Sequence, residues 1–143
     1  CYMADTGLLM AMAFNEKELI SSQLYKKIFF DKLTFNEGMI IENIVAQMLT
    51  AADRKLYFFS RNEHDDNSST LEIDFLTSKN SITSKHNIIP IEVKSGNRYT
   101  FSSLNKLISK YKDFISEPII IHTMDLKEEN GILYIPIYMT QII

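Results

Sequence analysis

The sequence predicts an α/β protein in which helices flank a mixed central sheet, and two observations carry this prediction. The segments IIPI (88–91) and PIII (118–121) are short continuous apolar runs, which suit strands covered on both faces. From Asn36 onward, the periodicity predicts the order helix, three strands, helix, strand. A chain of 143 residues can bury a real core, so we expect one domain over residues 1–143.

The first third of the chain is expected to be mainly helical. Asp5 or Thr6 can cap the first helix, and Thr34 or Asn36 can cap the third, which carries an apolar stripe with the 3.6-residue period. The expected elements are a short strand over Cys1–Ala4 and helices over Gly7–Phe14, Glu16–Lys32 and about Asn36–Asp53.

Strands dominate the remainder, separated by polar loops at 62–70, 79–87 and 125–131. The final apolar segment, Ile137–Ile143, is expected to pack against the core. The expected elements are strands over Lys55–Arg61, Leu71–Ser78 and Ile88–Lys94, a helix over Ser102–Ile115, and strands over Ile119–His122 and Ile132–Ile135.

Composition excludes several classes of protein. Fifteen basic and eighteen acidic residues give a net charge of −3, so this is not a strongly basic nucleic-acid binder, and contact with DNA would need a local basic patch. No apolar run reaches the ~18 residues of a membrane span, and no signal peptide is recognisable. The single cysteine, Cys1, suits a reducing, cytoplasmic setting. Because the sequence starts at Cys1 within a strand-like stretch, we interpret it as a piece of a longer protein.

The most informative feature is charge placed inside two consecutive apolar strands. Glu72 and Asp74 interrupt the first strand, and Glu92 and Lys94 interrupt the second. Residues i and i+2 of a strand point to the same face, so each pair projects together. A buried charge is costly unless it is paired or bound to a metal. A helix carrying Glu42 precedes both strands, and together these residues predict a site.

Two interpretations of these charges remain open. Carboxylates are the ligands that Mg²⁺ prefers, and a lysine beside such an ion can stabilise charge on a phosphate, which is the chemistry of metal-assisted phosphodiester hydrolysis. Alternatively, the charges form ion pairs on a half-exposed sheet edge, with Lys94 neutralising Glu92 or Asp74.

The order of these motifs resembles a known superfamily. Asp74 followed by Glu92-Val93-Lys94, within the order helix-strand-strand-strand-helix-strand, resembles the PD-(D/E)xK nucleases. Nearly all of residues 1–143 also looks like the uncharacterised C-terminal domain found behind the AAA-type ATPase module of many bacterial and archaeal proteins. The stretches that carry this second resemblance are ADTGLL (4–9), EGMIIEN (37–43), EIDFL (72–76), IPIEVKSG (89–96) and GILYIPIYM (131–139).

The resemblance implies a restriction-endonuclease-like core and a role for each charged residue. It implies that Mg²⁺ or Mn²⁺ is the cofactor, and that the ATPase module of the same full-length chain is a partner. No GxxxxGK[ST] phosphate-binding loop occurs here, so this piece does not hydrolyse ATP. The implied site consists of Asp74 and Glu92 as metal ligands with the Val93 carbonyl as a further one, Lys94 as the catalytic lysine, Glu42 as the helix glutamate that completes the site, and Glu72 in support.

Basic residues after the second charged strand are candidates for contact with nucleic acid. Arg98, Lys106 and Lys110, with Lys112 nearby, could grip phosphates, although a solvated helix face is an equally good interpretation. The aromatic residues of this region, Tyr99, Phe101 and Tyr111, fit core packing better than base stacking. His64, His86 and His122 lack ligand spacing, so we assign them no metal.

Two functions are therefore carried forward, and whether the chain is an enzyme stays open. The first is a Mg²⁺-dependent nuclease-like domain attached to an ATPase, in which a metal-activated water attacks a phosphodiester. The second is a catalytically silent module that binds nucleic acid or a protein partner, or that assembles the ATPase. A homo-oligomer is compatible with both functions.

Overall fold

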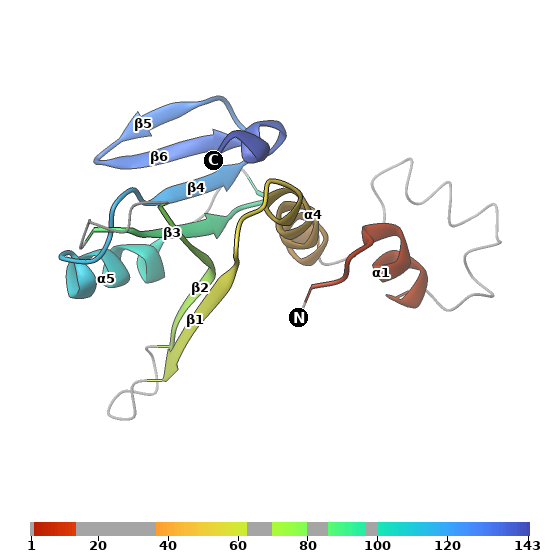
Figure 1. The fold of residues 1–143 in the computed structure, drawn as a ribbon, viewed down its shortest axis with the longest axis horizontal. Coiled ribbons are helices and arrows are strands. Elements are labelled where there is room, and N and C mark those ends of the chain that lie inside the picture. Colours follow the sequence, from red (N-terminus) through yellow and green to blue (C-terminus); the bar gives the residue numbers. More distant parts are fainter. Residues whose placement is uncertain (1, 14–36, 63–69, 80–85, 97–99) are drawn as a thin grey trace.

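The computed structural model describes residues 2–13, 37–62, 70–79, 86–96 and 100–143. Within them lie the helices α1 (Thr6–Ala13), α4 (Glu37–Ala51) and α5 (Ser102–Tyr111) and the 3₁₀ helix η1 (Ile137–Ile142). The strands are β1 (Tyr57–Asn62), β2 (Thr70–Ser78), β3 (Ile88–Val93), β4 (Ile119–His122), β5 (Lys127–Glu129) and β6 (Ile132–Pro136) (Figure 1).

These strands form one mixed sheet in the order β1-β2-β3-β4-β6-β5. The first three are antiparallel neighbours, whereas β3, β4 and β6 run parallel. The link from β3 through α5 to β4 is a helical crossover, as parallel neighbours require. The predicted mixed α/β sheet with flanking helices is therefore confirmed.

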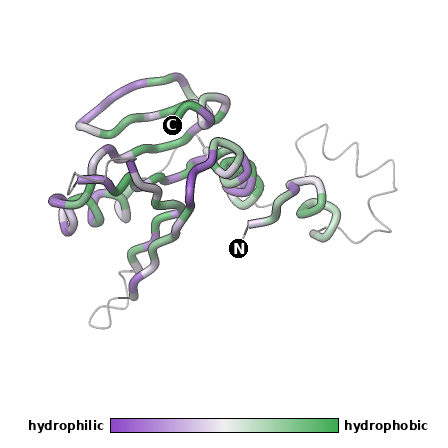
Figure 2. The backbone as a smooth tube through the Cα atoms, viewed as in Figure 1, coloured by the Kyte–Doolittle hydropathy of each residue, from purple (hydrophilic) through white to green (hydrophobic). Residues whose placement is uncertain are grey.

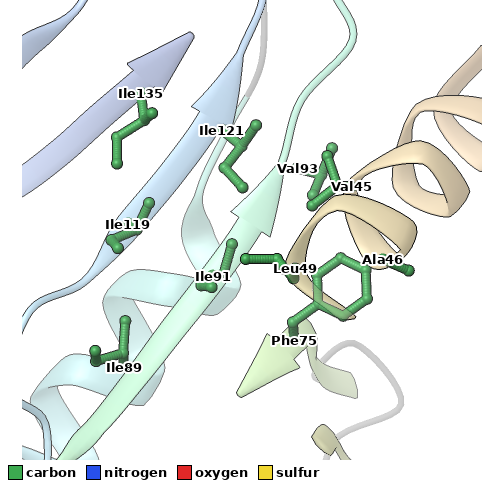
Figure 3. Close-up of a cluster of buried hydrophobic side chains, with 10 residues drawn as sticks. All are labelled: Val45, Ala46, Leu49, Phe75, Ile89, Ile91, Val93, Ile119, Ile121 and Ile135. Carbon is green, nitrogen blue, oxygen red and sulfur yellow. The ribbon is translucent and has the colours of Figure 1, made fainter. Parts of the chain in front are cut away.

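The two faces of the sheet carry separate hydrophobic clusters. The cluster on the α4 face includes Leu49 of α4 together with Ile119 and Ile121 of β4, and Figure 3 shows these side chains with their neighbours. The cluster on the α5 face includes Leu104 of α5 and Ile120 of β4. Since alternate residues of one strand enter different clusters, α4 and α5 cover opposite faces. Figure 2 shows the hydrophobic β4 and β6, which lie inside the sheet, and a hydrophilic β5 at its edge.

Most of the predicted elements are found with small shifts at their ends. Asp5 caps α1, because its Oδ1 accepts a hydrogen bond from the Leu8 backbone N–H at 2.8 Å. The predicted strand at Cys1–Ala4 is wrong for residues 2–4, which form no strand. The predicted helix over Ser102–Ile115 ends at Tyr111. The predicted helix over Glu16–Lys32 and the caps Thr34 and Asn36 lie outside the described residues.

The loop predicted over 125–131 contains a strand that sequence reasoning missed. Lys127–Glu129 pairs antiparallel with β6, although all three of its residues are charged. Its pairing depends on the two-residue turn Asn130-Gly131, whose residues have φ angles of +54° and +74°. Positive φ at both positions is typical of the type I′ turn that favours tight hairpins, and Asn-Gly is its usual sequence.

Alanine in place of Gly131 is expected to destabilise the protein by about 1–2 kcal/mol, because an L side chain is strained at this φ. Nothing lies within 4 Å of the added Cβ, so the cost comes from the backbone alone. Urea denaturation measures it, and Asn130→Gly is the matched control because glycine tolerates the φ angle at that position. Equal stability of Gly131→Ala and the wild type would contradict the turn assignment.

No helix in the described part of the chain combines the length and the apolar character that a membrane span requires.

Candidate functional site

The candidate site lies where β2 and β3 separate. Their ladder runs from the pair Ser78–Ile88 to the pair Phe75–Ile91. Beyond this point Asp74 Oδ2 accepts a hydrogen bond from the Val93 backbone N–H at 2.7 Å, so a carboxylate replaces the next backbone contact. The N–H and C=O of one strand residue point to the same side, which means that the Val93 carbonyl also faces β2.

A β-bulge in β2 orients Asp74. Tyr57 pairs with Leu76 and Phe59 pairs with Ile73, so the two residues Asp74 and Phe75 lie opposite a single residue of β1. The extra residue reverses the alternation of side chains along β2. Ile73 therefore belongs to the α5-face cluster and Phe75 to the α4-face cluster, although they are two residues apart. Bulges commonly re-aim side chains next to functional sites.

Glu92 is a buried charge in a central strand. It lies between β2 and β4, next to the buried Ile120, and only 6% of it is exposed. Its Oε1 accepts a hydrogen bond from Lys94 Nζ at 2.8 Å. Among the described residues, Glu92 Oε2 is a buried side-chain oxygen with no hydrogen-bond partner. Burial raises the pKa of Glu92, and the hydrogen bond and charge of Lys94 oppose this rise.

The predicted ion pair between Lys94 and Glu92 is thus present, but it is not on a half-exposed edge. The strand that carries it has neighbours on both sides, and the glutamate is buried. A buried pair with one unpaired carboxylate oxygen is a poor source of stability. The ion pair therefore does not by itself explain why the charge is there.

The other predicted carboxylates interact electrostatically with this pair. Burial and the charge of Asp74 raise the pKa of Glu42, while Lys94 lowers it. Burial raises the pKa of Asp74 and Glu72 adds to the rise, whereas the Val93 hydrogen bond and Lys94 lower it. Carboxylates from α4, β2 and β3 therefore lie near enough to Lys94 and to one another to interact electrostatically.

A cavity of about 400 Å³ opens onto the carboxylates of α4 and β2, whereas Glu92 of β3 is not among its lining residues. Glu42, Glu72 and Asp74 contribute to its lining. Aromatic side chains form much of the rest, namely Tyr2, Tyr57, Phe58 and Phe75. Phe58 is 77% exposed, so the rim of the cavity presents an open aromatic surface.

Sequence reasoning missed two residues of this region, Tyr2 and Asn43. Tyr2 lines the cavity, and burial together with Glu42 and Asp74 raises its pKa to about 12. Asn43 is buried within α4 next to Glu42. A polar residue inside the apolar stripe of that helix was a usable signal for Asn43. Tyr2 lies forty residues before Glu42 in the sequence, so no local pattern could connect the two residues.

The predicted nucleic-acid contacts are only partly described. Lys106 and Lys110 are exposed on α5, which covers the opposite face from α4. Arg98 and Tyr99 lie outside the described residues. The nucleic-acid role of the basic residues stays a prediction, whereas the core packing of Phe101 against Tyr134, in an edge-on contact of 6.5 Å between ring centroids, is confirmed.

The chemistry of the site fits a hard divalent cation. Its donors are oxygens, they carry more negative than positive charge, and one of them is the buried, unpaired Glu92 Oε2. No group of three or more His, Cys, Asp or Glu side chains within the described ranges is already arranged to hold an ion. A cation here would instead use the carboxylates of Asp74 and Glu92 with the Val93 carbonyl and non-protein oxygens, and Mg²⁺ commonly uses only one or two carboxylates.

Comparison with known proteins identifies one family and no individual relative. Residues 37–139 match the family described as "Domain of unknown function (DUF4143)". The match contains Glu42, Asp74, Glu92 and Lys94, and it leaves out Tyr2. Neither a curated protein nor a solved structure matches the chain.

Proposed function

This chain belongs to the DUF4143 family, and we propose that the junction of β2 and β3 is the site of a Mg²⁺- or Mn²⁺-dependent, nuclease-like domain with a restriction-endonuclease-like core. The observation that carries the proposal is the unpaired, buried Glu92 Oε2 beside Asp74 and Lys94. A protein retains such a costly group where it serves binding or chemistry.

Each side chain has a distinct role in this proposal. Asp74, held by the Val93 N–H, and Glu92 hold the ion. Lys94, whose ammonium lies 2.8 Å from Glu92 Oε1, stabilises negative charge on a phosphate and orients the attacking water. Glu42 reaches the same group from α4 and completes it. A bound divalent ion would supply a water of lowered pKa and neutralise phosphate charge.

A silent binding module is the second candidate, and a specific observation favours it. Lys94 already neutralises part of Glu92, and the predicted phosphate-binding residues Lys106 and Lys110 lie on α5, across the sheet from α4 and Glu42. Under this alternative the domain binds a partner or helps to assemble the ATPase that the sequence resemblance places in the same chain. Such a module would not need to bind a metal.

Titration of Mn²⁺ and of Mg²⁺ by calorimetry separates the two functions. We expect the wild type to bind the ion and Asp74→Ala to bind it at least about tenfold more weakly, because the variant loses a ligand and the contact that holds β3. Asp113→Ala, at an exposed aspartate after α5, is the matched control and should bind like the wild type.

Failure of the wild type to bind either ion at millimolar concentration would sink the nuclease proposal. If binding is found, cleavage of linear, branched and single-stranded DNA should be assayed with the same three proteins. Cleavage by the wild type and by Asp113→Ala, but not by Asp74→Ala, is the expected pattern.

A further inference from the structure

The segment that precedes α1 is held on α4 by the buried amide of Asn43, with a longer hydrogen bond of 3.4 Å from Gln47 Nε2 to the Met3 carbonyl. The Met3 backbone N–H donates to Asn43 Oδ1 at 2.7 Å, and Asn43 Nδ2 donates back to the Met3 carbonyl at 3.1 Å. The same Nδ2 donates to Thr6 Oγ1 at 3.0 Å. Only 1% of Asn43 is exposed, so these bonds form in a largely dry environment where an unmade bond is costly.

This anchoring places Tyr2 over the acidic site. The Tyr2 ring packs against Phe75 with centroids 4.9 Å apart, and Tyr2 lines the same cavity as Glu42, while burial and the charge of Glu42 raise the pKa of the Tyr2 hydroxyl. Phe75 directly follows Asp74 at the bulge, and Glu42 directly precedes Asn43 on α4. Tyr2 therefore bridges the helix that carries Glu42 and the strand that carries Asp74.

The contacts of Tyr2 differ from those of an ordinary core residue. Tyr2 lines the cavity together with Glu42 and Asp74, so it faces the acidic group instead of lying within a purely apolar cluster. Glu42 and Asp74 repel each other, so without a second contact Glu42 would tend to turn away from the strand. A neutral hydrogen-bond donor can hold Glu42 in place without neutralising it.

We propose that Tyr2 and Asn43 are positioning residues of the acidic site. Asn43 holds residues 2–6 on α4, and the Tyr2 hydroxyl, placed in the cavity that Glu42 and Asp74 line, in turn donates the hydrogen bond that holds the Glu42 carboxylate beside Asp74. The consequence for cation affinity rests on the proposed function, whereas the placement of Tyr2 by Asn43 does not. A segment outside the family match thus supplies part of the site.

Mn²⁺ titration of Tyr2→Phe, Asn43→Ala and the double variant tests the proposal. Tyr2→Phe keeps the ring on Phe75 and removes only the hydroxyl, so we expect unchanged thermal stability with about tenfold weaker Mn²⁺ binding. Asn43→Ala should weaken binding to a similar extent, and the double variant should be no weaker than Asn43→Ala, because both residues act through one contact. Tyr138→Phe is the control, since Tyr138 is 77% exposed on η1.

Nuclear magnetic resonance of a labelled Tyr2 ring, without metal, tests the placement separately. Asn43→Ala should mobilise the ring and expose the Met3 amide to hydrogen exchange. If that variant does not fold, Asn43→Asp, which keeps the acceptor and loses both donated bonds, takes its place. An equally ordered Tyr2 ring in the folded variant would overturn the proposal.

The Mn²⁺ titration and the resonance measurement of the Tyr2 ring also separate this proposal from the proposed function. If the wild type binds Mn²⁺ and Tyr2→Phe binds it equally well, the positioning role is wrong and the metal site stands. If the wild type binds no Mn²⁺, the metal site is wrong, and the ring measurement alone decides whether Asn43 places Tyr2.

Discussion

Alanine in place of Phe75 is expected to lower the free energy of unfolding by about 3–5 kcal/mol, the usual cost of removing a buried aromatic ring. Phe75 is 1% exposed, and its ring fills the space between the sheet and α4 near Ala46 and Leu49 (Figure 3). It also supports the Tyr2 ring. The loss should therefore also weaken Mn²⁺ binding, through the bulge that orients Asp74.

Phe58→Ala is the matched control for this prediction. Phe58 lies opposite the bulge in β1 but is 77% exposed, so its removal should change the free energy of unfolding by no more than about 0.5 kcal/mol. Urea denaturation of both variants measures the difference. Similar losses for Phe75→Ala and Phe58→Ala would show that the ring between α4 and the sheet does not hold this part of the core.

The central strands could be predicted from sequence because burial dictates their composition. β4 was predicted with both ends correct, since IIIH is continuous, apolar and bounded by Pro118 and a polar segment. β3 was predicted to within one residue for the same reason. β5 could not be recognised from hydrophobicity, because its exposed charged residues belong to the sheet only through the turn at Asn130-Gly131.

That the charges of β2 and β3 interact with one another was predictable from the sequence, but their geometry was not. Charges inside apolar strands indicated Asp74, Glu92 and Lys94, and the structure places Asp74 against the amide beside Glu92. The bulge that turns β2 from one face to the other has no local sequence signal, since it arises from pairing with β1. The contact of Asn43 with Met3 likewise depends on how α4 lies relative to the start of the chain.

The buried carboxylate of Glu92 destabilises the folded protein, and the size of this cost can be measured. Glutamine in place of Glu92 is expected to raise the free energy of unfolding at neutral pH by about 1–3 kcal/mol, because it removes a buried negative charge that is paired through only one of its oxygens, while it abolishes cation binding. Glutamine keeps the shape of the side chain, and its carbonyl oxygen can still accept the hydrogen bond from Lys94. A gain in stability with a loss of binding is typical of residues kept for function.

The pH dependence of this gain follows from the raised pKa of Glu92. Burial makes the folded protein hold the proton above the ordinary pKa of 4.5, so the carboxyl favours folding below pH 4.5, and that contribution is lost as pH rises through the raised folded-state pKa. Glutamine does not ionise, so the variant should resemble the wild type near pH 4 and exceed it increasingly toward pH 8. Thermal unfolding across this range measures the gap, with Glu117→Gln, at a half-exposed carboxylate before β4, as the control. A gap that is absent at pH 8, or that widens toward pH 4, would mean that the buried Glu92 carboxylate carries no cost in the folded protein.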